Sequence, residues 1–318
     1  MVWAIFAHGD SDGVSSAALV SAFLEWRGQE SRVVFTHPVG LLNDLREFAD
    51  SCEGLFVVDV ALDELHMSEL LRVLSVFSEN RVVIYVDHHP VPEGFEVPKS
   101  LVWIHDLCCS ASELTFRYLS GLGLDLEYSR VALYGALGDY LDETSWVKHE
   151  MSRWDRRAVY LEAGILTQGL EGSRRDYEFK RRVVSHLASN KLPSTMNELV
   201  EKSLIQAVKD ENLRIWVKNN VVRHGGVSYV VNPPGSIGRA ANYAKIYGEA
   251  RVGIAAEERG DIYVMSLRGG PEVDLNKVLR EISRKLGIHG GGHPVAAGAR
   301  VKKEQFQEFL GELIERVK

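Results

Sequence analysis

The stretch VWAIFAHGDSDG at residues 2–13 decides the fold class. Its apolar start at 2–6 predicts a buried strand, and the polar residues that follow predict the end of that strand. Apolar periodicity then predicts a helix over 16–26. The alternation continues with strands expected at 32–36, 54–60, 81–86 and 101–105, and with helices expected at 41–48 and 62–77. This order is typical of an α/β domain with a doubly wound, mainly parallel sheet.

The length of 318 residues indicates two domains. We expect a metal-binding catalytic domain at 1–185, a helical linker at 186–212 and a smaller α/β domain at 213–318. In the smaller domain, strands are predicted at 213–217, 227–231, 251–256 and 262–267, and a helix at 274–286.

Composition narrows the class of protein. The chain is 45% hydrophobic and 25% charged, close to the globular average, which excludes disordered and collagen-like chains. Three cysteines do not make a disulfide framework, so a reducing cytoplasm is expected. The apolar runs are too short to span a membrane. A net charge of −7 would ordinarily argue against nucleic acid, but a metal site in the sequence keeps that partner open.

Candidate metal ligands stand directly after the predicted strands. Ligands bind beyond the carboxyl ends of strands in an open parallel sheet, so these side chains are expected to gather at one edge. Carboxylate and imidazole donors together suit divalent first-row metals, and two such ions serve attack at phosphorus. One such residue alone is more typical of a cap or turn, but the whole set favours a metal site. The set comprises His8, Asp10 and Asp12 in an extended loop made flexible by Gly9 and Gly13, then Asp59, Asp87, His88, His89 and Asp139.

Three features carry weaker signals for anion binding. The glycine run at 290–292, followed by His293, would present amide hydrogens to an anion, although a helix C-cap is the alternative. Arg239 would contact phosphate from the first turn of a helix, or Ser236 simply caps that helix. A basic cluster would guide a nucleic-acid strand or form a solvated helix face; it comprises Arg174, Arg175, Lys180, Arg181 and Arg182.

The candidate ligands resemble the signature motifs of the DHH phosphoesterase superfamily, and segments 266–268, 290–294 and 296–298 resemble its DHHA1 domain. The resemblance implies an active site in the cleft between the two domains. It implies one metal on His8, Asp10 and Asp59, and a second on Asp12, Asp59, His88 and Asp139. His89 would lie beside the scissile phosphate, with Asp87 orienting the neighbouring histidines. The substrate's phosphate would be held by Arg268, Gly290, Gly291, Gly292 and His293.

The mixed ligands favour two Mn²⁺ ions, with Mg²⁺ or Co²⁺ as alternatives. The architecture is similar to archaeal RecJ-like and Hef-associated nucleases and to short oligoribonuclease-type members. That similarity implies an exonuclease on single-stranded DNA or RNA, acting in repair or replication, with 3′→5′ polarity favoured by the resemblance alone. The alternatives are a nanoRNase-type short-oligonucleotide or cyclic-dinucleotide phosphodiesterase, and a non-catalytic scaffold of a replication or repair complex. An inorganic pyrophosphatase is disfavoured by the DHHA1-like segments. Single-stranded nucleic acid and a repair or replication protein are the expected partners, and the family is compatible with a homo-oligomer.

Overall fold

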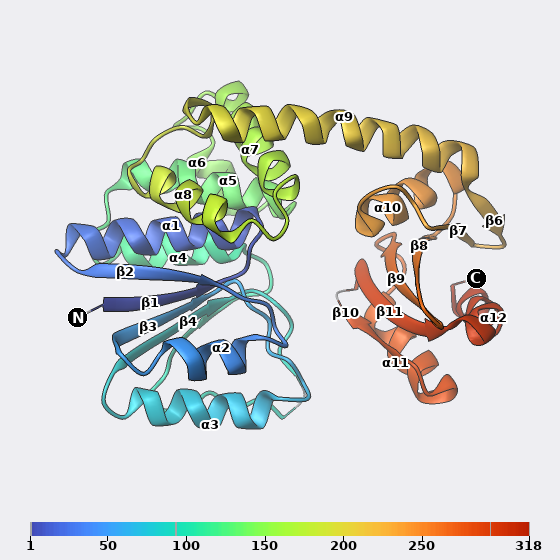
Figure 1. Cartoon of the computed structure of the whole chain (residues 1–318), viewed down its shortest axis with the longest axis horizontal. Coiled ribbons are helices and arrows are strands. Elements are labelled where there is room, and N and C mark those ends of the chain that lie inside the picture. The colour runs from blue at the N-terminus through green and yellow to red at the C-terminus, as the bar shows by residue number, and fades with distance from the viewer. Residues whose placement is uncertain (1, 93, 293, 318) are drawn as a thin grey trace. The chain divides into compact units, whose positions relative to one another are not determined.

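The computed structural model describes residues 2–92, 94–292 and 294–317 (Figure 1). The chain divides into two compact units, residues 1–206 and 207–318, and helix α9 (Asn197–Asn220) runs from one into the other. Within the described residues, no helix is both long and apolar enough to cross a membrane.

The first unit is built on a five-stranded parallel sheet. In the strand order β2-β1-β3-β4-β5, the chain adds β2 on one side of β1 and then β3, β4 and β5 on the other side. The switch point of this doubly wound sheet therefore lies between β1 and β3. The strands are β1 (Val2–Ala7), β2 (Glu30–Phe35), β3 (Cys52–Val58), β4 (Val82–Asp87) and β5 (Val102–His105). The expected α/β class with a parallel sheet is therefore confirmed.

Helices cover both faces of this sheet (Figure 1). Residues alternate along β1, so Ile5 packs into one core and Phe6 into the other, and both are fully buried. Burial on both faces explains why these strands are almost continuously apolar. Helices α2 (Leu41–Phe48) and α3 (Met67–Ser78) lie on one face. The other face carries α1 (Ser11–Trp26), α4 (Ala111–Ser120), α5 (Ser129–Gly138), α6 (Ser145–Glu150), α7 (Arg156–Glu171) and α8 (Tyr177–Ala188).

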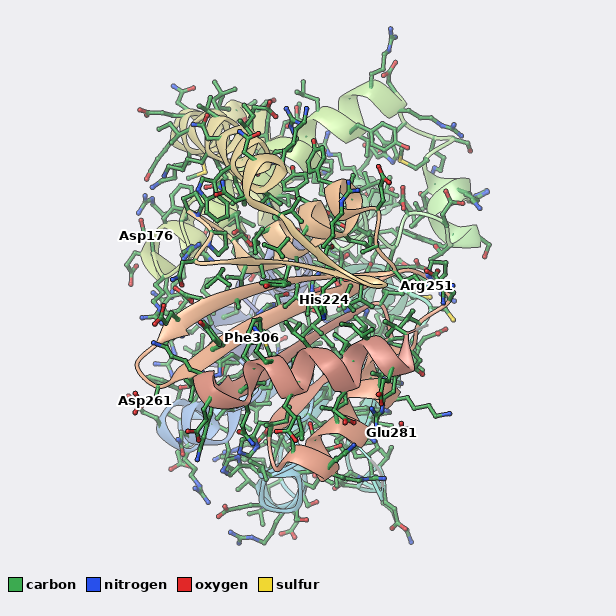
Figure 2. All side chains as sticks on the ribbon, turned by 90° about the vertical axis from the view of Figure 1, so that its right-hand side faces the viewer. Asp176, His224, Arg251, Asp261, Glu281 and Phe306 are labelled. Atoms are coloured by element: carbon green, nitrogen blue, oxygen red, sulfur yellow. The ribbon has the colours of Figure 1, made fainter. Side chains whose placement is uncertain are left out.

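The second unit contains a six-stranded sheet in the order β10-β11-β9-β8-β7-β6, in which β7 and β8 are parallel and the other pairs antiparallel. Phe306, labelled in Figure 2, packs its ring 4.9 Å from that of Tyr263. Glu281 of α11 (Leu275–Leu286) pairs with Arg316 of α12 (Phe306–Arg316) at 3.4 Å, which links the two helices. The strands are β6 (Val222–His224), β7 (Val227–Val231), β8 (Val252–Arg259), β9 (Ile262–Gly269), β10 (His289–Gly292) and β11 (Ala296–Lys302), and the helices are α10 (Ile237–Gly248), α11 (Leu275–Leu286) and α12 (Phe306–Arg316).

Three local predictions were wrong. Segment 213–217, expected as a strand, lies inside α9, where Leu213 and Val217 are four residues apart and both buried on one helix face. Strands β6, β10 and β11 were not predicted. Helix α1 begins at Ser11 rather than at residue 16, so the expected extended loop ends at Asp10. Within that helix, a Cβ on Gly13 would lie 2.4 Å from the His8 carbonyl oxygen, so close packing, rather than a flexible loop, requires glycine there.

Candidate metal centre

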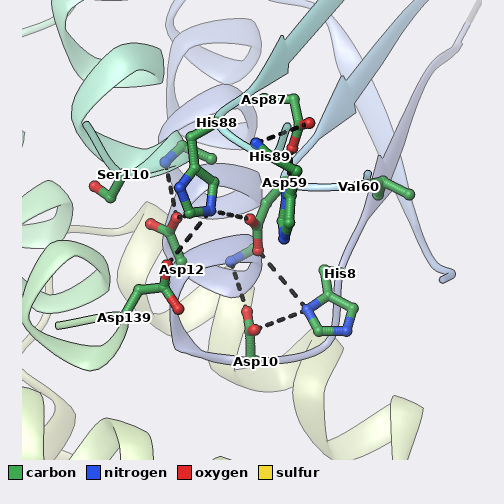
Figure 3. Close-up of polar contacts among 12 residues, drawn as sticks. His8, Asp10, Asp12, Asp59, Val60, Asp87, His88, His89, Ser110 and Asp139 are labelled. Carbon is green, nitrogen blue, oxygen red and sulfur yellow. Dashed lines mark hydrogen bonds and ion pairs between the residues drawn. The ribbon is translucent and has the colours of Figure 1, made fainter. Parts of the chain in front are cut away.

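The predicted ligands gather at the carboxyl edge of the first sheet (Figure 3). Three parallel strands end at this edge, and the polar residues that follow each of them point into one space. His8 follows β1 and Asp59 follows β3. Asp10 is the N-cap of α1, since its Oδ1 accepts a hydrogen bond from the Gly13 amide at 3.0 Å. Asp139 closes the C-terminal end of α5, which brings a helix terminus to the same edge.

The first cluster consists of His8, Asp10 and Asp59. His8 Nδ1 lies 2.7 Å from Asp10 Oδ2 and 3.8 Å from Asp59 Oδ2. Their candidate ligand atoms all lie within 4.8 Å of one another. Asp59 has φ 58°, a left-handed conformation that aspartate tolerates better than most residues. The structure thus brings together the residues expected around one metal ion.

The second cluster is centred on His88. Its Nε2 lies 3.3 Å from Asp59 Oδ1, 3.4 Å from Asp139 Oδ2 and 3.9 Å from Asp12 Oδ2. Asp59 therefore points one oxygen at each cluster, as a carboxylate bridging two ions would. Asp12 is part of the first turn of α1, and both its oxygens accept amide hydrogen bonds, from Ala111 at 2.8 Å and Ser112 at 2.9 Å. The N-terminus of α4 fixes this carboxylate in place.

The chemistry of the cluster fits divalent cations. Asp59 Oδ2 and His88 Nε2 are both buried, and neither has a hydrogen-bond partner in the described part of the chain. Buried polar atoms are nearly always satisfied, so two orphan atoms facing one space indicate a missing ligand. Oxygen and imidazole donors in this mixture match first-row divalent metals.

The electrostatics of the cluster also favour cations. Burial, together with repulsion from Asp10 and Asp12, raises the pKa of Asp59 well above its ordinary value. Burial and the same two carboxylates raise the pKa of Asp139 to about 7. Burial lowers the pKa of His88. Asp10 raises the pKa of His8, and the pKa of Asp10 is itself lowered, so these two favour an ion pair. Without metal, Asp59 and Asp139 therefore favour their protonated forms and His88 its neutral form, and binding of cations would displace the carboxyl protons.

Asp87 and His89 form a pair beside the clusters. Asp87 is buried, and its Oδ1 lies 2.8 Å from His89 Nδ1, while its Oδ2 accepts the His89 amide at 3.2 Å. Burial alone would lower the pKa of His89, but Asp87 outweighs it and the pKa is raised. The hydrogen bonds of Asp87 orient His89, whereas the sequence predicted that Asp87 would orient both His88 and His89. A His105 ring nitrogen, 2.7 Å from the His89 carbonyl oxygen, adds a contact that sequence reasoning missed.

Lys180 has a role that the sequence did not suggest. It was expected in a basic cluster, yet it is buried, and its ammonium donates to the carbonyl of Gly9, between two candidate ligands. Arg181 donates to the Val33 carbonyl at 3.0 Å, and Arg182 pairs with Glu198 at 2.7 Å. These three side chains therefore have hydrogen-bond or ion-pair partners within the first unit. Of the cluster, Arg174, Arg175 and Arg182 are exposed.

In the second unit, Arg268 lies on β9. Its Nη1 donates to the Ser266 hydroxyl and to the Leu267 carbonyl, both at 3.0 Å. Its Nη2 lies 2.8 Å from the position that a Cβ on Gly238 would occupy, in the first turn of α10. The guanidinium therefore lies against the N-terminal turn of a helix.

Two other predictions in this unit need correction. Arg239 is ion-paired with Asp210 of α9, a partner that the sequence did not indicate, and Ser236 occupies the N-cap position without a side-chain cap hydrogen bond.

The glycine run is not a loop. Gly290, Gly291 and Gly292 belong to β10, an edge strand paired with β11. The Gly292 amide donates to Asn276 Oδ1 at 3.3 Å, so it is not free for an anion as expected. Gly292 has φ 145°, and a Cβ there would lie 2.8 Å from the Ala296 carbonyl oxygen, so glycine is required. His293 lies outside the described residues.

Comparisons with known proteins agree with this architecture. Residues 3–138 match the DHH family, N-terminal domain, and residues 226–318 match the DHHA1 domain. RecJ from Thermus thermophilus, solved with Mn²⁺, has a TM-score of 0.74 at 16% identity, over 99% of this chain and 51% of that one. An exonuclease RecJ bound to manganese has a TM-score of 0.66 at 16% identity, over 99% of this chain and 89% of that one. The pGpG-specific phosphodiesterase PggH from Vibrio cholerae has a TM-score of 0.54 at 12% identity, over 100% of this chain and 98% of that one.

These likenesses concern the fold. The chain spans about half the length of the Thermus protein. No curated protein matched the sequence.

Proposed function

The chain belongs to the DHH family of phosphoesterases and carries a DHHA1 domain, and on this premise we propose that it is a two-metal exonuclease of single-stranded nucleic acid. The proposal covers DNA and RNA, with 3′→5′ polarity favoured and Mn²⁺ as the preferred ion. Imidazole in both clusters supports Mn²⁺ over Mg²⁺, because Mg²⁺ prefers oxygen ligands and retained waters.

One observation carries the proposal, namely the position of Asp59 between two clusters. Its Oδ2 faces His8 and its Oδ1 faces His88, and Oδ2 and the His88 Nε2 lack hydrogen-bond partners among the described residues. One ion would be held by His8, Asp10 and Asp59, and the other by Asp12, Asp59, His88 and Asp139. Bound divalent ions of this kind activate water at neutral pH and stabilise charge at phosphorus.

The protein's own groups would bind and orient the phosphate. Asp87 accepts the Nδ1 hydrogen of His89 and so orients the ring beside the clusters. The raised pKa of His89 favours the protonated ring, which donates to a phosphate oxygen. In the second unit, Arg268, set against the first turn of α10, stays a candidate donor to phosphate. A scaffold protein has no need of this complete set of candidate ligands.

A second candidate is a short-oligonucleotide or cyclic-dinucleotide phosphodiesterase. The observation in its favour is the likeness of fold to PggH, which extends over nearly the whole of both chains. An enzyme of this kind would lose activity as the substrate lengthens.

One gel experiment separates the two functions. Single-stranded DNA and RNA, from dinucleotides to long oligonucleotides and labelled at either end, are incubated with Mn²⁺, Mg²⁺, Co²⁺ or EDTA. The proposal expects a ladder from one end of long substrates with Mn²⁺ and none with EDTA. Cleavage restricted to the shortest substrates supports the second candidate. A wild type that cleaves none of them, with any ion, overturns both.

A further inference from the structure

Helix α5 ends in an unusual way, immediately beside the metal centre. The Leu141 amide donates to the Ala136 carbonyl at 2.9 Å, and the Tyr140 amide donates to the Leu137 carbonyl at 3.3 Å. This pair of bonds is the Schellman motif, which places the first residue beyond the cap in a left-handed conformation. Tyr140 occupies that position with φ 60°. Glycine is the usual residue here because any Cβ is unfavourable in this conformation.

Within the described part of the chain, the side chain of Tyr140 makes no hydrogen bond that would offset its unfavourable backbone. The residue is 88% exposed. Two other left-handed residues, Asn190 and Asn232, differ in this respect, because asparagine tolerates the conformation and both side chains accept hydrogen bonds. A bulky residue in a strained conformation without packing or bonding of its own points to a function outside the fold.

The position of Tyr140 suggests what that function is. It follows Asp139 directly, so the two Cα atoms are about 3.8 Å apart. Asp12, Asp59 and His88 are buried, whereas the side chain of Asp139 is 38% exposed and forms part of the open rim of the clusters. The ring of Tyr140 is therefore carried by the backbone next to a residue of the exposed rim of the clusters.

We propose that Tyr140 is a substrate-binding residue whose ring stacks on the nucleobase next to the phosphate that is cut. This inference rests on the proposed function, because it takes nucleic acid as the substrate. Every base has a π-face, so an exposed aromatic ring binds a strand without selecting its sequence. The ring also explains why glycine is absent, since glycine would relieve the backbone but offer no surface for stacking.

The proposal predicts opposite effects on stability and on substrate binding. Tyr140→Gly and Tyr140→Asn relieve the left-handed strain, so the melting temperature is expected to rise by about 1–3 °C. The same variants lose the stacking surface, so KM for an oligonucleotide is expected to rise roughly 5- to 100-fold. Tyr140→Phe keeps the ring and is expected to retain the wild-type KM. A merely structural tyrosine would give changes of stability and activity in the same direction.

Two controls sharpen the test. Glu249, the C-cap of α10, also has a left-handed φ of 51°, so Glu249→Gly should raise stability similarly and leave KM unchanged. The second control is an oligonucleotide with abasic residues at both ends, which offers no base to stack on. On that substrate, the difference in KM between wild type and Tyr140→Gly should largely disappear.

The possible results separate the inference from the proposed function. A wild type that degrades oligonucleotides while Tyr140→Gly keeps its KM overturns the role of Tyr140 alone. An equal loss on normal and abasic substrates also overturns it, because the effect would not depend on the base. A wild type that cleaves neither substrate with Mn²⁺ overturns the proposed function, and the role of Tyr140 with it.

Discussion

Replacing the shared carboxylate by its amide, Asp59→Asn, should stabilise the metal-free protein and remove its response to metal. Asparagine has nearly the same size as aspartate and is equally suited to the left-handed conformation at φ 58°, so the substitution removes a charge without adding strain. Asp59→Ala would remove the charge and also change the size and backbone preference of the residue, so it is less informative.

The magnitude follows from the geometry of the first cluster. The candidate ligand atoms of Asp59 and Asp10 lie within 4.8 Å, which at an effective dielectric constant of about 20 corresponds to about 3.5 kcal/mol of repulsion. The raised pKa of Asp59 shows that a proton relieves part of this repulsion in the wild type. We therefore expect a gain of about 1–2 kcal/mol in the free energy of unfolding at pH 8, or about 2–8 °C in melting temperature.

The gain should depend on pH in a defined direction. A carboxyl whose folded pKa is raised contributes stability that is present below its unfolded pKa and is lost as the pH rises through the folded pKa. Wild type and Asp59→Asn should therefore be similarly stable in acid and diverge towards pH 8. Mn²⁺ at about 100 times its dissociation constant should stabilise the wild type by about 2.7 kcal/mol per site, and the variant by much less.

Thermal unfolding after EDTA treatment, with and without Mn²⁺, measures both effects. The exposed Asp50, changed to asparagine, controls for a general effect of removing one negative charge. The reasoning is refuted if metal-free Asp59→Asn is less stable than the wild type at pH 8. It is also refuted if Mn²⁺ raises the melting temperature of both proteins equally.

Three further predictions concern the same centre. His88→Ala should lower Mn²⁺-dependent cleavage by more than the roughly 10–100-fold typical of losing an outer-shell partner, with an unchanged far-ultraviolet circular dichroism spectrum; full activity would contradict the two-metal assignment. The stabilisation by Mn²⁺ should grow between pH 5 and 8, because Asp139, with a pKa of about 7, must lose its proton before binding; a shift independent of pH would contradict this. Gly135→Ala should cost about 1–3 kcal/mol in urea unfolding, because its Cβ would lie 2.3 Å from the Ser112 hydroxyl and 2.7 Å from Asp12 Oδ1. Gly164→Ala, in an open part of a helix, should instead gain about 0.5–1 kcal/mol, and equal effects of the two changes would argue against close packing at Gly135.

The first sheet could be predicted because its strands are buried on both faces. Such strands are short apolar runs with polar ends, and that pattern is visible without any tertiary information. The topology rule for parallel sheets then placed the polar residues after β1, β3 and β4 at one edge, where the structure has them. The start of α1 was misplaced because serine, aspartate and glycine at 11–13 are typical of loops. Asp10 in the N-cap position was the available signal for the true start.

The second unit was harder to predict for a physical reason. Strands β10 and β11 are rich in glycine and alanine, which lack the β-branched side chains that usually mark strands. Their pairing with each other and with β9 places them in the sheet, and that information is not local. Segment 213–217 has strand-forming residues, but the burial of Leu213 and Val217 on one helix face prevails over their propensity.

The acidic net charge takes on a different meaning once its location is known. Asp12, Asp59 and Asp87 are buried, so their charges do not form a surface that repels phosphate. Asp12 and Asp59 face a space where two divalent ions would offset most of the local charge, and Lys180 brings one ammonium to the adjacent backbone. Part of the acidic charge behind the net value of −7 therefore lies inside the candidate metal site rather than on the surface. Whether an acidic protein binds nucleic acid depends on where its carboxylates lie, and here the structure places the decisive ones inside the site that the phosphate would approach.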